Sequence, residues 1–264
     1  MADEKHTQRR GQREYVAVTA AGNCFLGASL SSSADREGLE QAYGVFRTEA
    51  LQCDPDYQPD SVTTDGWGAT RSAWSRLFPG ITLILCFLHA VLKIRDLCRS
   101  RQRLWQNLQD RLWQVYQATS KQQFAQRLRR LLEWSKTADL PERIAQQLRR
   151  IHTKSKLFQR AFNFDNAYRT SNCVDRPMNY LDRVLYAMQY FHGSAKSGEL
   201  NTRSMAILWN FHPYGRKTRA KKQGVLSPFE ELNGFRYHDN WLRNLLIASS
   251  LNGRRANQHK LLRN

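Results

Sequence analysis

The order of hydrophobic and polar positions predicts a β-hairpin and then a helix at the start of the chain. Two β-rich runs, EYVAVTAA and CFLGASL, predict strands at 15–20 and 24–30 around a Gly-Asn turn. In residues 35–52 the apolar side chains recur every three or four positions, which is helical spacing. Asp35 stands directly before this run, where a side chain can cap the helix.

The next stretch alternates strand-like and helix-like runs. SVTTD at 61–65 predicts a short strand that ends on an acid, and GATRSAWSRLF at 68–78 predicts a helix stopped by Pro79-Gly80. ITLILCFLH at 81–89 is a continuous apolar run, which predicts a strand buried on both faces. These elements indicate a sheet with helices packed against it.

Beyond about residue 91 the pattern becomes helical. Leu and Trp recur at three- and four-residue spacing through 91–162, where Pro141 is expected to open a further helix. Helices are also expected at 173–193 and 239–251, whereas the basic segment GRKTRAKKQG at 215–224 is expected to be a loop. A small sheet followed by a mostly helical half predicts an α/β or α+β fold.

Charge is distributed unevenly along the chain. Residues 1–94 hold 9 Lys/Arg and 11 Asp/Glu, whereas residues 95–264 hold 32 and 12, so the net charge of +18 is concentrated in the second part. A field of one sign favours a polyanionic partner, and nucleic acid fits best because Lys and Arg neutralise phosphates. A solvated basic face is the alternative interpretation, and no lipidation motif indicates a membrane partner.

Composition narrows the class further. A chain of 264 residues with 41% hydrophobic side chains can form a sizeable core, which argues against wholesale disorder. The sequence has no apolar run of 18 residues, and its charged start MADEKHTQRRGQREY is unlike a secretory signal. Five scattered cysteines favour reduced thiols over a disulfide framework. We therefore expect a cytoplasmic, nucleoid-associated protein.

Asp65 is the first candidate for chemistry. It ends a predicted strand and precedes Gly66, and a carboxylate at a strand end is well placed to bind Mg²⁺. A turn Asp before Gly is the structural alternative. The longer segment TDGWGATRSAWSRLFPGITLILCFLH resembles the second-acid region of transposases of bacterial insertion sequences related to the Mutator-like superfamily. In that family an Asp-Gly pair ends a strand, and a helix, Phe-Pro and a strand closing on Cys-x-x-His follow.

This resemblance implies an RNase H-like α/β catalytic domain, with a mixed sheet, flanking helices and three acids that bind metal. Asp3 would be the first acid, with Glu4 as an adjacent alternative, and Asp65 the second. The run RTSNCVDR places Asp175 where the family has its third acid, with Asp in place of the usual Glu. The implied activity is DNA strand cleavage and strand transfer, with two Mg²⁺ (or Mn²⁺) ions as cofactors.

Two of these acids also have structural interpretations. Asn172, three residues before Asp175, makes a helix-start signature in which the acid is stabilised by the helix dipole. Asp3 can be a terminal charge without a role. The weaker candidates for the third acid are Asp165, Asp182 and Glu230.

The spacing of the acids predicts the division into domains. Between Asp65 and Asp175 lie 109 residues, more than a compact RNase H-like fold needs, so an insertion domain is expected. We expect residues 1–94 to form the first part of the core and residues 95–165 a helical insertion. Residues 166–264 would then return to the core with its C-terminal helices, Asp175 and the basic loop.

Several further residues are candidates for supporting the site. His89, at the end of the predicted strand, can approach a phosphate or be a structural histidine, and both interpretations stay open. Trp67 can stack on a base, although core packing is favoured for a Trp beside a sheet. Cys86 is expected in the core, since no second ligand pair completes a zinc site. Contacts to DNA phosphates are expected from Arg216, Lys217, Arg219, Lys221 and Lys222.

The start of the chain departs from the family pattern. Only Met1 and Ala2 precede Asp3, whereas family members have a full strand there and a helical DNA-binding domain before it. We therefore expect an N-terminally truncated transposase that is poorly active alone. Its implied partners are transposon ends and target DNA, bound by a homo-oligomer. The alternatives are a repurposed fragment that binds DNA without cutting it, and an RNase H-like nuclease that acts on RNA or hybrids.

Overall fold

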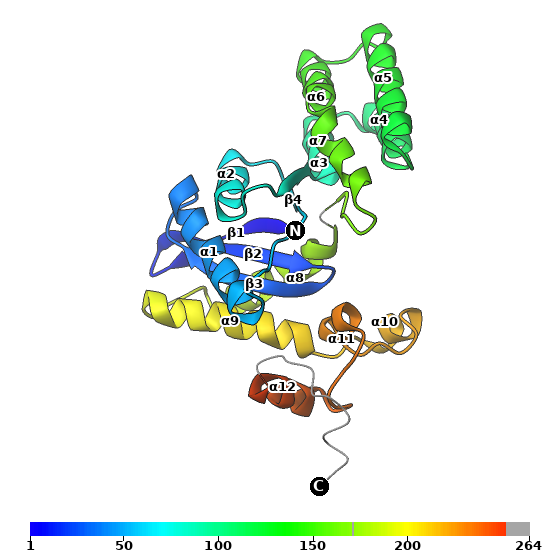
Figure 1. The fold of residues 1–264 in the computed structure, drawn as a ribbon. Coiled ribbons are helices and arrows are strands. Elements are labelled where there is room, and N and C mark those ends of the chain that lie inside the picture. The colour runs from blue at the N-terminus through cyan, green and yellow to red at the C-terminus, as the bar shows by residue number, and fades with distance from the viewer. Residues whose placement is uncertain (171, 252–264) are drawn as a thin grey trace. The chain divides into compact units, whose positions relative to one another are not determined.

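The computed structural model describes residues 1–170 and 172–251, apart from the Asn172 side chain. The chain divides into two compact units, which we describe separately. Unit 1 holds Met1–Asp3 and Ser33–Asn172, and unit 2 holds Glu4–Ser32 and the chain from Cys173 onward. The described residues form many helices and two small sheets (Figure 1), which confirms the mixed α/β class.

Unit 2 is built on a three-stranded sheet in the order β1-β2-β3. The β2–β3 pair is the predicted hairpin, and its antiparallel register runs from Tyr15 opposite Ser31 to Ala21 opposite Cys24. Most of the central strand is buried, and helices α9 and α11 contact β3 of this hairpin. The strands are β1 (Ala2–Arg9), β2 (Gln12–Ala21) and β3 (Cys24–Ser31).

Helix α9 (Ala195–Phe211) packs on β3. A Cβ atom on Gly198 would lie 2.7 Å from Leu30 Cδ1, so the absence of a side chain permits this close approach. Near the other end of the helix, Asn210 accepts a hydrogen bond from Phe25 N and donates one to Phe25 O, both at 2.8 Å. The remaining helices of unit 2 are α8 (Asn172–Ala187), α10 (Arg216–Lys221), α11 (Pro228–Asn233) and α12 (Trp241–Ser250).

Unit 1 contains Asp3 and Asp65, the first two predicted acids. Helix α1 (Arg36–Cys53) begins as predicted, because Asp35 Oδ1 accepts a hydrogen bond from Gly38 N at 2.8 Å. It packs on α2 (Gly68–Leu77) through aromatic side chains, among which Trp74 contacts both Tyr43 and Phe46. The sheet of this unit is a pair of short parallel strands, β4 (Ser61–Thr64) and β5 (Thr82–Leu85).

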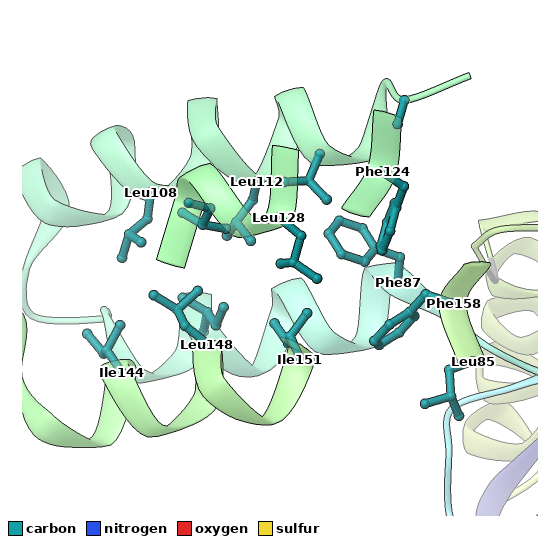
Figure 2. Packing of buried hydrophobic residues seen from close by; sticks show 14 of the residues in the cluster. Leu85, Phe87, Leu108, Leu112, Phe124, Leu128, Ile144, Leu148, Ile151 and Phe158 are labelled. Carbon is teal, nitrogen blue, oxygen red and sulfur yellow. The ribbon is translucent and has the colours of Figure 1, made fainter. Parts of the chain in front are cut away.

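A helical block follows β5 and has its own hydrophobic core. Figure 2 shows the core, in which Leu112 of α4 and Leu128 of α5 point toward Leu148 of α6. Each of these leucines is at most 1% exposed, as expected for the apolar faces of amphipathic helices. The block consists of α3 (Phe87–Leu97), α4 (Gln102–Tyr116), α5 (Lys121–Thr137), α6 (Glu142–Thr153), α7 (Ser155–Gln159) and the 3₁₀ helix η1 (Arg160–Asn163).

Three local predictions are wrong. The apolar run 81–89 is not one strand, because β5 ends at Leu85 and α3 begins at Phe87. The basic segment 215–224 is not a loop throughout, since Arg216–Lys221 forms α10. The sheet does not lack its leading strand either, because β1 includes Asp3 and continues to Arg9. Continuous apolar or basic runs carry no period, so the sequence pattern cannot separate strand, helix and loop there.

The five strands lie in two sheets within the described residues, one of three strands and one of two. The helices expected at 173–193 and 239–251 are present as α8 and α12, and Pro141 stands directly before α6 as expected. The division into 1–94, 95–165 and 166–264 stays a prediction.

Candidate functional site

Asp65 follows β4 directly, at the carboxyl end of the parallel strand pair. Its Oδ1 atom accepts a hydrogen bond from Trp67 N at 2.7 Å, and Thr64 Oγ1 accepts one from Gly66 N at 3.2 Å. Gly66 has φ +95°, and a Cβ atom there would lie 2.9 Å from Leu85 Cδ2. Glycine is therefore favoured after Asp65 in this turn, which holds the half-buried Asp65 carboxylate at the strand end.

His89 lies in the first turn of α3, immediately after β5, and not at a strand end as predicted. A side-chain hydrogen bond with the buried Cys86 raises the pKa of His89 to about 9. Burial acts in the opposite direction, and the negative charges of Asp3 and Asp65 add to the increase. Together these interactions favour the protonated imidazole, and both of the predicted carboxylates in this unit contribute to the shift.

Asp3 belongs to unit 1, whereas the adjacent alternative Glu4 belongs to unit 2. Successive side chains of a strand point to opposite faces, so one of the two can face His89. Asp3 is the one whose charge acts on His89, and its carbonyl oxygen accepts a hydrogen bond from Tyr43 Oη at 3.3 Å. The choice between Asp3 and Glu4 as the partner of Asp65 stays a prediction.

The segment Tyr168–Arg169 also borders these strand ends. Thr63 Oγ1 donates to Tyr168 O at 2.7 Å, and Phe87 N donates to Arg169 O at 3.0 Å. Neither residue was predicted to have a role, although the segment directly precedes the Thr-Ser-Asn motif. Its contacts hold the chain that leads to the motif beside the end of β4 and the start of α3.

The Arg169 side chain reaches in the other direction, to the end of α4. Its guanidinium donates to Tyr116 O at 2.5 Å and to Ala118 O at 2.8 Å, and it lies 4.5 Å from the ring centre of Phe162. Carbonyl groups at a helix C-terminus lack partners within the helix, so a cation there stabilises the end. Arg169 is thus a structural link between the strand ends and the helical block of unit 1.

Asp175 lies in the first turn of α8, in unit 2, with its side chain half-buried next to the buried Val174. This confirms its expected position at the start of a helix. Ser171 and the Asn172 side chain lie outside the described residues, so the proposed cap is not tested.

The weaker candidates for the third acid have ordinary surroundings. Asp182 forms an ion pair with Lys5 at 2.5 Å, and Glu230 forms one with Arg236 at 2.5 Å. Asp165 is exposed. Ion pairing gives Asp182 and Glu230 structural roles.

The chemistry of Asp3 and Asp65 fits a magnesium ion. Mg²⁺ binds oxygen ligands and commonly takes one or two carboxylates while keeping several waters. Among the described residues, no group of three or more His, Cys, Asp or Glu side chains is arranged to hold a metal ion. Asp3 and Asp65 each carry hard oxygen ligands of the type that suits Mg²⁺ or Mn²⁺.

The predicted DNA-binding residues on and beside α10 differ in how open they are to a DNA phosphate. Arg216, Lys217 and Lys221 are exposed. Lys222 forms an ion pair with Glu231, and its ammonium lies 5.3 Å from the ring centre of Tyr214. Arg219 is half-buried. Three of the five side chains thus remain open to a phosphate, and Lys222 is already used within the protein.

Trp67 is not in the core as the sequence pattern favoured. Its side chain is 41% exposed, directly after Asp65 and next to the first turn of α2. An exposed indole beside a candidate active site is available to stack on a base. Cys86, by contrast, is 2% exposed and confirms its expected place in the core.

Comparisons with known proteins add no assignment. No protein-family model matches the sequence, and no curated protein matches it. None of the described helices is both long and apolar enough to cross a membrane.

Proposed function

We propose that this protein is the catalytic part of a DNA transposase, which cuts and joins DNA strands with Asp3, Asp65 and Asp175 as its carboxylates. The observation that carries the proposal is the position of Asp65 at the carboxyl end of parallel strands, in a turn that only glycine permits at the next position. In α/β folds ligands bind at this edge of the sheet. The segment from Asp65 to His89, which resembles the transposase second-acid region, supports the same assignment.

Each of the candidate side chains in unit 1 would have a separate role in catalysis. Asp3 and Asp65 would hold a divalent cation through carboxylate oxygens. When bound, two such ions supply Lewis-acid stabilisation and a reactive oxygen nucleophile at neutral pH. His89, whose raised pKa favours the protonated form, would attract the DNA phosphate to the carboxylates that otherwise repel it. Trp67 would stack on a base next to the cleaved bond.

An RNase H-like arrangement belongs to the same proposal. Within unit 1, parallel strands that alternate with helices α1 and α2 are the kind of element order that such a fold contains. Asp175, at the start of a helix after the inserted helical block, would complete the set of acids. The proposal includes action on transposon ends by a homo-oligomer, as the resemblance implies.

A cleavage assay on the full chain tests the proposal. Supercoiled DNA with terminal inverted repeats is incubated with Mg²⁺ or Mn²⁺, and nicked and joined products are measured. We expect Asp65→Asn and Asp175→Asn to lose at least about 100-fold in rate, since metal stabilisation is worth several kcal/mol. Asp60→Asn is the matched control, because Asp60 is exposed at the opposite end of β4. Cleavage that survives Asp65→Asn would exclude the proposed catalytic role.

The second candidate function is DNA binding without cleavage. The observation that favours it is the charge excess of residues 95–264, which does not depend on the three acids. Tight DNA binding by wild type, together with no metal-dependent cleavage under any of these conditions, would select it. Preferential cleavage of RNA or RNA–DNA hybrids would instead select an RNase H-like nuclease.

A further inference from the structure

A pocket of about 240 Å³ opens on the side of the helical block formed by α4 and α5. Both helices belong to unit 1, and Figure 1 shows them side by side. No acidic side chain lines this pocket. Its lining consists of Arg111, Gln114 and Gln117 from the C-terminal part of α4 and its end, and Arg127, Arg130 and Leu131 from α5.

Two of the three arginines are held in place by the protein. The Arg111 guanidinium lies over the Trp134 ring, 4.3 Å from its centre, and Arg127 Nη1 donates to Gln114 O at 2.6 Å. Stacking leaves the N–H edges of a guanidinium free to donate, and a single bond leaves Arg127 with further donors. The cations are thus preorganised, which lowers the entropy lost when a ligand binds.

The helices beneath the pocket are rigidly packed. Leu112 and Leu128, on the inner faces of α4 and α5, are almost fully buried (Figure 2). Spacing of three or four residues places Arg111, Gln114 and Gln117 on one side of α4, and Arg127, Arg130 and Leu131 on one side of α5. The pocket is therefore a fixed feature of the block.

The charges in this pocket lack compensation. In the part of the chain that the structure describes, Arg111, Arg127 and Arg130 form no ion pair with a carboxylate. The neighbouring Arg129, by contrast, pairs with Glu133 at 3.6 Å. Three guanidinium groups around one pocket repel each other, and an anion that enters the pocket relieves this repulsion.

We infer that this pocket binds a backbone phosphate of duplex DNA. Guanidinium groups donate in a planar fork that matches phosphate oxygens, and the two glutamines add neutral donors. The pocket opens to solvent, so a phosphate can enter while its strand continues on either side. Duplex DNA is the expected source because the inference rests on the DNA-binding part of the proposed function and gives it a defined site outside the strand-end acids.

Binding of a fluorescent duplex to the full chain, measured by anisotropy over a series of salt concentrations, tests this site. Arg130→Gln is the decisive variant, because Arg130 is exposed and its loss leaves the packing intact. We expect Kd to rise about tenfold, in line with one charge-assisted contact. The slope of log K against log salt should fall by about 0.9 for the lost phosphate contact. Arg130→Lys should restore part of the affinity, since it keeps the charge but loses the fork.

Arg129→Gln is the matched control, with the same change of charge one residue away on the same helix. We expect it to change Kd by less than about twofold, because Arg129 already pairs with Glu133. Equal effects of Arg129→Gln and Arg130→Gln would show a diffuse field and overturn the site. Tighter, Arg130-dependent binding of duplex RNA, or full displacement of DNA by millimolar inorganic phosphate, would overturn the choice of DNA.

The outcomes separate this site from the catalytic proposal. Asp60→Asn should leave both duplex binding and cleavage unchanged, because Asp60 belongs neither to the pocket nor to the strand-end acids. A protein that never cleaves DNA, but whose binding depends on Arg130 and not on Arg129, would retain the phosphate site and lose the proposed activity. Cleavage that depends on Asp65, with no specific effect of Arg130→Gln, would give the opposite result.

Discussion

The α10 segment and the α4–α5 pair are both rich in basic side chains, yet they use their charge differently. In the α10 segment, Lys222 is paired with Glu231 and covers Tyr214. Between α4 and α5, Arg111, Arg127 and Arg130 converge on one pocket without carboxylate partners in the described residues. The sequence marks the first segment as the stronger candidate because its charges are consecutive. Whether a basic side chain is available to bind a phosphate depends on its neighbours in space, which a run of charges in the sequence does not reveal.

The largest expected effect on stability comes from a change in the hydrophobic core beneath the α4–α5 pocket. Leu128→Ala truncates a fully buried side chain in the core of the helical block, and we expect it to lower the free energy of unfolding by about 2–5 kcal/mol. Urea denaturation measures this loss. Leu200→Ala is the control, since Leu200 is 57% exposed and should change stability by less than about 0.5 kcal/mol. Similar losses of unfolding free energy in the two variants would contradict the tight packing of this core.

A smaller loss of stability is expected when the guanidinium of Arg169 is removed from the C-terminal end of α4. Arg169→Met removes the two hydrogen bonds to Tyr116 O and Ala118 O, and we expect a cost of about 1–3 kcal/mol, measured by urea denaturation. Arg176→Met, at an exposed position of α8, is the matched control and should have little effect. If Arg169→Met also weakens DNA binding, the position of α4 matters to the pocket. Unchanged stability would mean that water replaces the guanidinium without cost.

The Glu231 ion pair beside α10 predicts a modest dependence of stability on pH. Burial raises the pKa of Glu231, but hydrogen bonds from Lys222, Tyr214 and Asn23 outweigh burial and lower it. A lowered carboxyl pKa stabilises the folded state above the ordinary value, and this contribution disappears as pH falls through the folded pKa. We expect Glu231→Gln to cost up to about 1 kcal/mol at pH 7, because the pair is partly exposed. Denaturation at pH 7 and at pH 3 should show the difference from wild type shrinking with acid; a constant difference would disprove the linkage.

The smallest expected effect tests whether Lys222 contacts DNA at all. Lys222→Gln should change the Kd for duplex DNA by less than about twofold, because its ammonium is already bound to Glu231. Lys217→Gln, at an exposed position of α10, is the comparison, and its salt slope should fall by about 0.9 if α10 touches a phosphate. A larger effect from Lys222→Gln than from Arg130→Gln would reverse the ranking of the two basic regions.

Elements fixed by local chemistry were predictable from the sequence. The Asp35 cap, the β2–β3 hairpin and the helices between residues 91 and 162 follow from side chains close in sequence, and all are present. Long α9 was missed, because its sequence AKSGELNTRSMAILWNF mixes small and polar residues and depends on contact with β3. Strand β1 was missed because its sequence ADEKHTQR is almost entirely polar and has no apolar alternation, although it pairs with the adjacent β2.

The candidate site was predictable in part. Asp65 follows its strand as expected, and the Asp-Gly turn explains why the strand ends there. The pairing of His89 with Cys86, the exposure of Trp67 and the Arg169 link were not predictable, because each depends on how β5 gives way to α3 and on contacts across the unit. The phosphate pocket had no sequence signal beyond general charge, since its arginines are separated along two helices.

Unit 2 is built from two segments that lie far apart in the sequence, and this has a consequence for biosynthesis. Lys5 pairs with Asp182, 177 positions later, and Gln8 and Arg10 bond to Phe191. A ribosome that adds roughly 5–20 residues per second needs about 10–35 s to supply these partners. During that interval the first hairpin has emerged without α9, and its strand edges are open to pairing with other chains. The contiguous helical block, rich in local contacts, can fold within the same interval. Strand β1 therefore remains without these partners until the chain has been synthesised as far as Phe191.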